Sequence, residues 1–113
     1  MIIGVGCDIV QIERIRKAMR KESFLRILTE QERGLYESLS PNRQPEWLAG
    51  RFAAKEAVYK AIHTLHPCVL SKIEILSTSE GAPYCALTDC DIHLSISHEK
   101  DYAIAYAIAE KKE

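Results

Sequence analysis

Apolar and small residues alternate along the first ten positions of the chain, a pattern typical of a β-strand. The side chains of one face are Ile3, Val5, Cys7 and Ile9. The opposite face carries Gly4, Gly6 and Asp8. Glycine inside a strand usually marks close approach by another backbone or by a ligand. We therefore expect a strand over residues 2–10, with the Asp8 carboxylate at the end of an open strip.

Apolar residues recur at helical spacing over about residues 46–65, which predicts a long helix. Its buried stripe is formed by Ala54, Ala57, Val58, Ala61, Ile62 and Leu65. Beside it, Phe52, Glu56 and Lys60 fall four apart and form a second stripe. A carboxylate and an ammonium group held one turn apart could bind a metal ion and a phosphate. An ordinary surface ion pair has the same pattern, so the helix alone leaves both interpretations open.

The segment between the first strand and the long helix predicts shorter helices. Residues 11–21 form one, with Ile12, Ile15 and Met19 facing inward. Residues 22–40 form one or two more. Within them, Thr29 followed by Glu32 is the spacing of a capping box, in which each side chain satisfies a backbone amide of the first helical turn.

The last third of the chain predicts strands at residues 69–77, 84–87, 92–98 and 102–109. Ile73 and Ile75 are expected on the core side of the first of these. The last strand has one face made only of alanine, which would let a helix or a second subunit come close. The predicted fold class is α+β in a single domain, residues 1–113. It has an N-terminal strand, helices including one long helix, and then a mostly antiparallel sheet.

Composition narrows the possible functions. The 113 residues are 47% hydrophobic and 27% charged, as in a globular domain. No apolar run approaches the roughly 20 residues that span a bilayer. The N-terminus lacks the pattern of a signal peptide, so we expect a cytoplasmic protein. The four cysteines show no metal-binding spacing and are expected to be free thiols.

Charge is unevenly distributed, although the net charge is only −1 and argues against nucleic-acid binding by the whole chain. The predicted helix at 11–21 has a single acidic residue, Glu13. Its basic residues are Arg14, Arg16, Lys17, Arg20 and Lys21. Such a run is commonly a solvated helix face. It would also suit docking of an acidic partner.

Asp8 and Glu56 are the candidate metal ligands. Two carboxylates with few other protein ligands suit Mg²⁺, which keeps several waters and often bridges carboxylates to a substrate phosphate. Arg51, Lys55 and Lys60 on one helix would repel one another unless an anion lies nearby, and we interpret them as phosphate ligands. Taken alone, Asp8 would more simply be a helix cap or a solvated carboxylate.

Three motifs, in this order, give the chain a resemblance to the holo-acyl-carrier-protein synthases, the small bacterial group of 4′-phosphopantetheinyl transferases. The first is Gly6-Cys7-Asp8-Ile9 with Arg14 after it. The second and most specific runs from Trp47 to Ala57, with Lys60-Ala61 beyond. The third joins Gly81-x-Pro83, residues 94–98 and Tyr102-Ala103.

The resemblance implies an enzyme that moves the phosphopantetheine arm of coenzyme A onto a serine of apo-acyl carrier protein, supporting fatty acid biosynthesis. Asp8 and Glu56 would hold Mg²⁺, and Lys60 would bind phosphate and steady the leaving group. These three residues would be catalytic. The serine proton would pass either to Glu56 or to water on the metal ion, and sequence does not choose between them.

The resemblance also implies contacts with the coenzyme and with protein partners. The coenzyme-binding residues would be Arg51, Phe52, Lys60, Pro83 and His98. The acidic carrier protein would dock on Arg14 and the other basic residues of the 11–21 segment. The family is typically homotrimeric, with its sites at subunit interfaces. Nucleic acids and membranes are not expected partners.

The turn at residues 62–67 departs from the glycine-rich turn of the family, so the residue that would meet the coenzyme's 3′-phosphate is open among His63, Thr64 and His66. This departure keeps a second hypothesis in view. The chain would then be a non-catalytic module that docks an acidic carrier protein through residues 11–21. A third hypothesis is an oligomeric scaffold with surface ion pairs.

Overall fold

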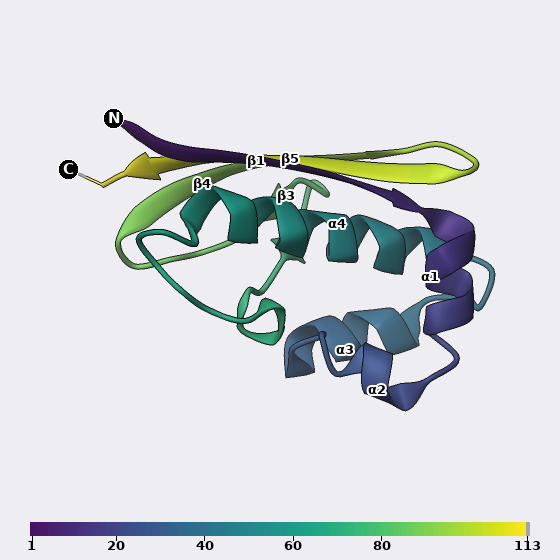
Figure 1. Ribbon diagram of the computed structural model, residues 1–113. Coiled ribbons are helices and arrows are strands. Elements are labelled where there is room, and N and C mark those ends of the chain that lie inside the picture. Colours follow the sequence, from purple (N-terminus) through teal and green to yellow (C-terminus); the bar gives the residue numbers. More distant parts are fainter. Residues whose placement is uncertain (113) are drawn as a thin grey trace.

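The computed structural model describes residues 1–112 and has an antiparallel sheet of three strands. β5 (Tyr102–Lys111) lies in the centre, between β1 (Ile2–Gln11) and β4 (Cys90–His98). The first and last strands of the chain are therefore neighbours. Figure 1 shows the helices on one side of this sheet, which confirms the predicted α+β class.

Four α-helices connect β1 to the second half of the chain: α1 (Ile12–Ala18), α2 (Glu22–Leu25), α3 (Glu30–Ser38) and α4 (Gln44–Ile62). α4 lies directly against the sheet, and α2 and α3 lie on its other side (Figure 1). α1 ends three residues earlier than predicted. α4 likewise ends before Leu65, which is 61% exposed, because a turn closes the helix through bonds from the amides of Leu65 and His66 to the Ile62 carbonyl.

Glycines in β1 allow α4 to pack backbone against backbone. A Cβ atom on Gly4 would lie 1.9 Å from the Ala61 carbonyl oxygen, and one on Gly6 would lie 1.8 Å from that of Ala57. The strip predicted beside Asp8 is therefore filled by the long helix. The alanine face of β5 is wholly buried and contacts the same helix: Ala103, Ala105, Ala107 and Ala109.

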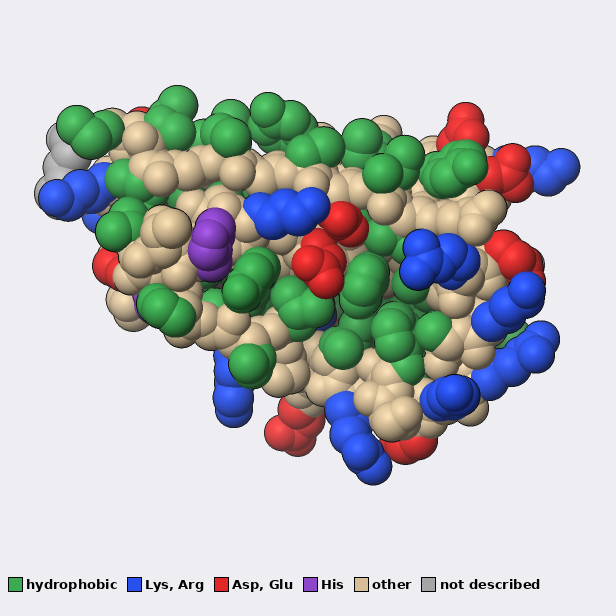
Figure 2. All heavy atoms as spheres, in the orientation of Figure 1, with side chains coloured by type: hydrophobic (Ala, Val, Ile, Leu, Met, Phe, Trp, Pro, Cys, Tyr) green, Lys and Arg blue, Asp and Glu red, His purple; other side chains and the backbone are tan. Residues whose placement is uncertain are grey.

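The outer face of the sheet remains open and apolar. Ile9 pairs with Ile104 across β1 and β5, and Cys7 pairs with Tyr106. These side chains are exposed, Ile9 to 63% and Tyr106 to 49%. Figure 2 shows hydrophobic side chains gathered along this side of the molecule. A contiguous exposed apolar patch is a common mark of a protein–protein interface.

The segment after α4 differs from the prediction of one strand over residues 69–77. It forms a 3₁₀ turn, η1 (Leu70–Lys72), and a short strand β2 (Leu76–Ser77) that pairs with β3 (Pro83–Tyr84). Ile73 and Ile75 are buried, as predicted. The strand is short because backbone groups of this segment bond to side chains of Lys55 and Glu32 instead of to a neighbouring strand.

The four cysteines are free thiols, as predicted: Cys7, Cys68, Cys85 and Cys90. Burial raises the pKa of Cys85 to about 11 and also raises that of Cys68 and Cys90. These three thiols are therefore poor nucleophiles at neutral pH. Within residues 1–112, no helix is both long and apolar enough to cross a membrane.

Candidate active site

β1 and α4 bring Asp8, Glu56 and Lys60 into one groove. The Lys60 ammonium lies 3.4 Å from Asp8 Oδ1 and donates to the Cys7 carbonyl at 2.9 Å. The Asp8 side chain is 18% exposed, whereas that of Lys60 is 50% exposed. Lys60 thus contacts β1 at Cys7 and Asp8, while half of its side chain stays open to solvent. Figure 2 shows acidic and basic side chains side by side over this part of α4.

The electrostatics of this groove act mainly on Glu56. Burial raises the pKa of its carboxyl, the negative charge of Asp8 raises it further, and the Lys60 cation opposes both effects. The two carboxylates are therefore close enough to repel each other. Such a pair gains stability from a cation placed between its oxygens, so the donor set fits a hard divalent ion.

Phe52 and Arg14 complete the groove from α4 and α1. The Phe52 ring packs against Phe24 of α2, with 5.7 Å between ring centroids. Phe52 therefore forms an apolar wall beside Glu56. Within residues 1–112, no group of three or more histidine, cysteine or acidic side chains is arranged to hold a metal ion. A metal in this groove would take its remaining ligands from substrate and water.

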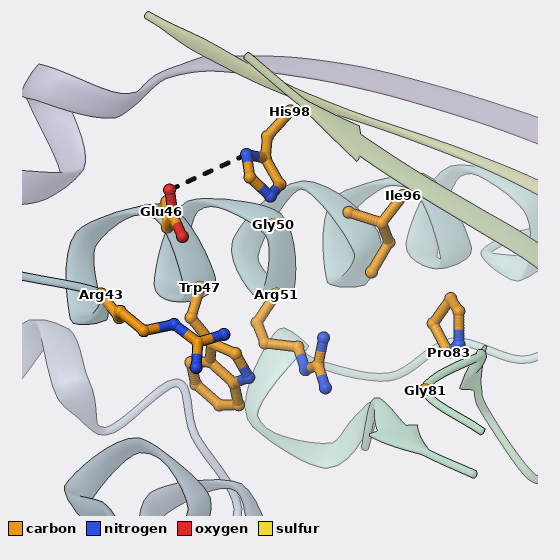
Figure 3. A pocket seen from close by; sticks show the side chains of 9 residues that line it. All are labelled: Arg43, Glu46, Trp47, Gly50, Arg51, Gly81, Pro83, Ile96 and His98. Atoms are coloured by element: carbon orange, nitrogen blue, oxygen red, sulfur yellow. Dashed lines mark ion pairs between the residues drawn. The ribbon is translucent and has the colours of Figure 1, made fainter. Parts of the chain in front are cut away.

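A second groove runs along the other side of α4, and Figure 3 shows its lining. Arg51 comes from α4, Pro83 from β3 and His98 from the end of β4. The Glu46 carboxylate lies 3.9 Å from His98 Nδ1. The second groove thus holds three of the predicted coenzyme-binding residues.

Arg51 is the most constrained side chain of the second groove. Its guanidinium stacks over the Trp47 ring, 4.7 Å from the centroid, and donates to Ser77 Oγ at 2.7 Å. Only 8% of the residue is exposed, and burial lowers its pKa. Its Nε atom is buried without a hydrogen-bond partner in the structure. A buried donor without an acceptor is costly, so an anionic or carbonyl ligand here would satisfy it.

The prediction that Lys55 binds phosphate is wrong. Its side chain is completely buried and lies 2.7 Å from Glu32 Oε1, whose side chain is also completely buried. Lys55 also donates to the carbonyls of Leu70 and Ile73. The anion that balances this cation is a carboxylate of the protein, not a ligand. Thr29 and Glu32 do form the predicted capping box.

The basic residues predicted at 11–21 lie on the exposed side of α1 and just after it: Arg14, Arg16, Lys17, Arg20 and Lys21. Arg16 pairs with Glu13 at 3.0 Å. Lys17 and Lys21 line a shallow surface groove with Phe24. Figure 2 shows basic side chains over this end of the molecule. The surface beside Asp8 and Glu56 is therefore positively charged.

Comparison with known proteins assigns the family of this chain. Residues 4–107 match the sequence model of the 4′-phosphopantetheinyl transferase superfamily. The chain belongs to this superfamily. A relative from Geobacillus sp. (strain WCH70), named holo-acyl-carrier-protein synthase, is 51% identical, with 98% of each chain covered. The family resemblance inferred from the three motifs is confirmed.

Solved structures agree with the family and with the fold. A holo-acyl-carrier-protein synthase from Bacillus anthracis str. Ames, in complex with CoA (3′,5′-ADP), is 40% identical, with a TM-score of 0.90 and 99% of each chain covered. The Helicobacter pylori enzyme in complex with coenzyme A is 30% identical, with a TM-score of 0.77; 94% of this chain and 99% of that one are covered.

The fold thus brings together Asp8, Glu56, Lys60 and Phe52, but keeps them apart from Arg51, Pro83 and His98, which line the second groove. Sequence reasoning did not assign roles to Arg43, Glu46 and Trp47, which also line the second groove. Glu46 could have been found, because it lies one helical turn before Gly50 and Arg51 and therefore on the same side of α4. Arg43 stands in a loop and gives none.

Sequence reasoning also missed an aromatic pair at the end of α4. The rings of Tyr59 and His63 are stacked, with centroids 5.6 Å apart, and both side chains are exposed. His63 Nδ1 lies 3.2 Å from the Lys60 carbonyl oxygen. A carbonyl only accepts hydrogen bonds, so the form of His63 that makes this bond carries a proton on Nδ1. The pair lies on the helix side that also carries Glu56 and Lys60.

Proposed function

We propose that this chain transfers 4′-phosphopantetheine from coenzyme A to a serine of apo-acyl carrier protein. The serine oxygen forms a bond to the phosphorus that carries pantetheine, and the bond to the bridging pyrophosphate oxygen breaks. Adenosine 3′,5′-bisphosphate leaves. The observation that carries the proposal is the meeting of Asp8, Glu56 and Lys60 in one groove of a phosphopantetheinyl transferase fold.

Asp8 and Glu56 are proposed to hold Mg²⁺ together with the pyrophosphate of coenzyme A. The proximity of the two carboxylates supports this, since each charge disfavours the other unless a cation lies near. When bound, Mg²⁺ would neutralise charge on the pyrophosphate. The exposed ammonium group of Lys60 would bind the leaving phosphate and neutralise part of its charge.

Glu56 is also the candidate base for the serine proton. Burial and the charge of Asp8 raise its pKa, and a carboxylate with a raised pKa accepts protons more readily near neutral pH. Phe52 lines the same groove as an apolar wall.

Coenzyme A is proposed to contact Arg51, Pro83 and His98 of a second copy of the chain. The two grooves have volumes of about 350 and 220 Å³, at or below the low end of the roughly 300–1,000 Å³ of typical ligand sites. Neither groove alone encloses a nucleotide coenzyme. Apposition of the first groove of one protomer with the second groove of its neighbour would complete the site.

A homotrimer is the proposed assembly, as in the family. The open apolar face of the sheet supports it, with Ile9, Ile104 and Tyr106 exposed on adjacent strands. Burial of such a patch between copies provides the main driving force for association. A closed ring would also repeat the pairing of first and second grooves around the symmetry axis.

His63 is proposed to meet the 3′-phosphate of the coenzyme, the choice left open between His63, Thr64 and His66. His66 already lies 3.2 Å from an Asp89 carboxylate oxygen. His63 instead is exposed on the same helix side as Lys60, with Nδ1 on the Lys60 carbonyl and Nε2 as its other ring nitrogen. In its protonated form this nitrogen donates to a phosphate oxygen.

The acidic carrier protein is proposed to dock on the basic residues of α1 and the turn after it. Arg14 lines the groove of Asp8 and Glu56, so a carrier bound there would present its serine beside them. Lys17, Lys21 and Phe24 offer charge and apolar surface next to it. We place the reaction in the cytoplasm, in support of fatty acid biosynthesis.

The transfer itself is tested by incubating the protein with apo-carrier protein and coenzyme A, with and without Mg²⁺, and measuring release of adenosine 3′,5′-bisphosphate by chromatography. The proposal predicts release that depends on both Mg²⁺ and the carrier. A non-catalytic docking module would bind the carrier without releasing any nucleotide, and that result would reject the enzyme.

A further inference from the structure

A buried ion pair connects α3 to α4 behind the second groove. Lys55 Nζ lies 2.7 Å from Glu32 Oε1, and both side chains have no exposed surface. The same carboxylate accepts the Thr29 amide at 2.8 Å through Oε1 and the Ile75 amide at 2.7 Å through Oε2. Burial lowers the pKa of Lys55, and the hydrogen bond that its ammonium group donates to Glu32 opposes this. Glu32 is thus the counter-charge of the buried Lys55 ammonium group.

The Glu32–Lys55 pair binds the backbone of the irregular segment that follows α4, residues 70–75. Lys55 donates to the carbonyls of Leu70 and Ile73, while Glu32 accepts from Ile75. All three protons of the ammonium group are thus used, by Glu32 and these two carbonyls. The backbone of residues 70–75 forms no long strand, and the side chains of Lys55 and Glu32 hold it instead.

This segment leads directly into a wall of the second groove. β2 pairs with β3, with Ser77 opposite Pro83, and Pro83 lines the groove. Ser77 also accepts from Arg51, which lies one helical turn before Lys55 on α4. The position of Pro83 relative to Arg51 therefore depends on where residues 70–77 are fixed.

We infer that Glu32 and Lys55 are positioning residues for coenzyme binding: they hold residues 70–77, and through them the β2–β3 wall, at a fixed distance from Arg51. This inference rests on the proposed use of the second groove by coenzyme A. The contacts of the pair lie on residues 70–75, whereas Glu56, the next residue on α4, lines the first groove; we therefore expect the larger effect on coenzyme binding in the second groove.

Removal of one member of the ion pair should lower the stability of the fold more than removal of both. Removing the Lys55 ammonium leaves a buried carboxylate without its counter-charge and two carbonyls without donors, which loosens the segment. Neutralising both residues removes the stranded charge but still leaves the Leu70 and Ile73 carbonyls without their donor. The double variant should therefore recover stability while the wall stays loose.

The experiment compares Lys55→Met, the double variant Glu32→Gln/Lys55→Met, and Glu37→Gln, which breaks an exposed ion pair with Arg33 on the same helix α3 as a matched control. For each, the KM for coenzyme A, the KM for the carrier and kcat are measured. Hydrogen exchange of the Ile75 amide is followed in parallel, because it reports on the segment without needing coenzyme.

The expected result is a KM for coenzyme A raised about tenfold in both Lys55 variants, with kcat and the carrier KM within about twofold of the unmodified protein. Ile75 should exchange slowly in the unmodified protein and at least about tenfold faster in the variants. Glu37→Gln should change none of these values.

A folded Lys55 variant with an unchanged KM for coenzyme A and unchanged Ile75 exchange would overturn the inference. If Lys55→Met does not fold, the double variant decides in the same way. Rapid Ile75 exchange in the unmodified protein would overturn it without any variant. If the unmodified protein does not bind coenzyme A, the proposed function fails, and Ile75 exchange alone decides whether the pair holds the segment.

Discussion

Lys60 and Asp8 are 52 residues apart in the sequence, yet Lys60 Nζ lies 3.4 Å from Asp8 Oδ1. The contact exists because α4 packs directly on the backbone of β1. Gly4 and Gly6 make that approach sterically allowed. The site therefore depends on two residues that have no side chains to contribute to chemistry.

Substitution of Gly6 by alanine should destabilise the protein and remove activity together. The new Cβ atom would lie 1.8 Å from the Ala57 carbonyl oxygen, so α4 must move away from β1 and carry Glu56 and Lys60 from Asp8. Overpacking of this kind costs about 1–3 kcal/mol or more. Urea unfolding measures the loss.

Gly34→Ala is the matched control. No atom lies within 4 Å of its added Cβ, and alanine is favoured over glycine inside a helix by up to about 1 kcal/mol. It should be neutral or stabilising. A Gly6→Ala variant as stable as Gly34→Ala would contradict the packing described above.

Glu56→Gln should stabilise the metal-free protein at neutral pH. Burial and the charge of Asp8 raise the pKa of Glu56 from its ordinary value of 4.5, so the folded state binds its proton more tightly than the unfolded chain does. Above the raised pKa, the charged carboxylate weakens the fold, and glutamine removes that penalty. We expect a Tm increase on the order of 2–5 °C at pH 7.5.

This gain should shrink as pH falls through the interval between the raised and the ordinary pKa, and vanish well below the ordinary pKa of 4.5, where Glu56 is protonated in both states. Thermal unfolding at a series of pH values measures it. Glu80→Gln, in an exposed turn, should show no comparable gain. A lower Tm for Glu56→Gln at neutral pH would argue against the penalty that burial and the charge of Asp8 place on the Glu56 carboxylate.

Reversal of charge on the basic helix should weaken carrier use selectively. Lys17→Glu/Lys21→Glu should raise the KM for an acidic carrier about tenfold at low salt and leave the KM for coenzyme A unchanged. The difference from the unmodified protein should narrow as salt screens the interaction. Lys111→Glu, exposed at the end of β5, is the control. Equal losses in both variants would place the docking surface elsewhere.

If each active site is shared between two protomers, mixing two inactive variants should restore part of the activity. Asp8→Ala removes one of the two carboxylates of the first groove, and Arg51→Ala removes the buried guanidinium of the second groove. If each site combines the two grooves from adjacent protomers, random exchange of subunits leaves about a quarter of the sites intact. Activity should rise from near zero after the variants are unfolded and refolded together. A mixture as inactive as its parts would indicate sites built within one chain.

The strands β1, β4 and β5 and the helix α4 could be predicted from the spacing of their apolar residues, but the order of the strands in the sheet was not predicted. Glu56 and Lys60 belong to the most specific motif, whereas Asp8 stands in a weaker one. The role of Lys55 could not. It lies beside Glu56 in the sequence, and only packing shows that one side chain turns into the core while the other faces Asp8. Glu32 was correctly predicted as a capping residue. Because that local role already explained its carboxylate, nothing in the sequence indicated its contact with Lys55.

The strand predicted at residues 69–77 was wrong for a related reason. Its alternation of apolar residues is real, and Ile73 and Ile75 are buried. However, the backbone of this segment bonds to Lys55 and Glu32, which lie far away in the sequence. Local pattern indicates which side chains are buried, but it does not indicate what satisfies the backbone.

The mass spectrum of a carrier protein shows whether this chain transfers phosphopantetheine and whether Asp8 and Glu56 are needed. Apo-carrier protein is incubated with coenzyme A, Mg²⁺ and either the unmodified protein, Asp8→Asn, Glu56→Gln, or Asp91→Asn as an exposed strand control. The account predicts that the unmodified protein and Asp91→Asn add one phosphopantetheine to the carrier, while the other two slow the addition at least about 100-fold. No added mass with the unmodified protein, or full rates with both Asp8→Asn and Glu56→Gln, would contradict it.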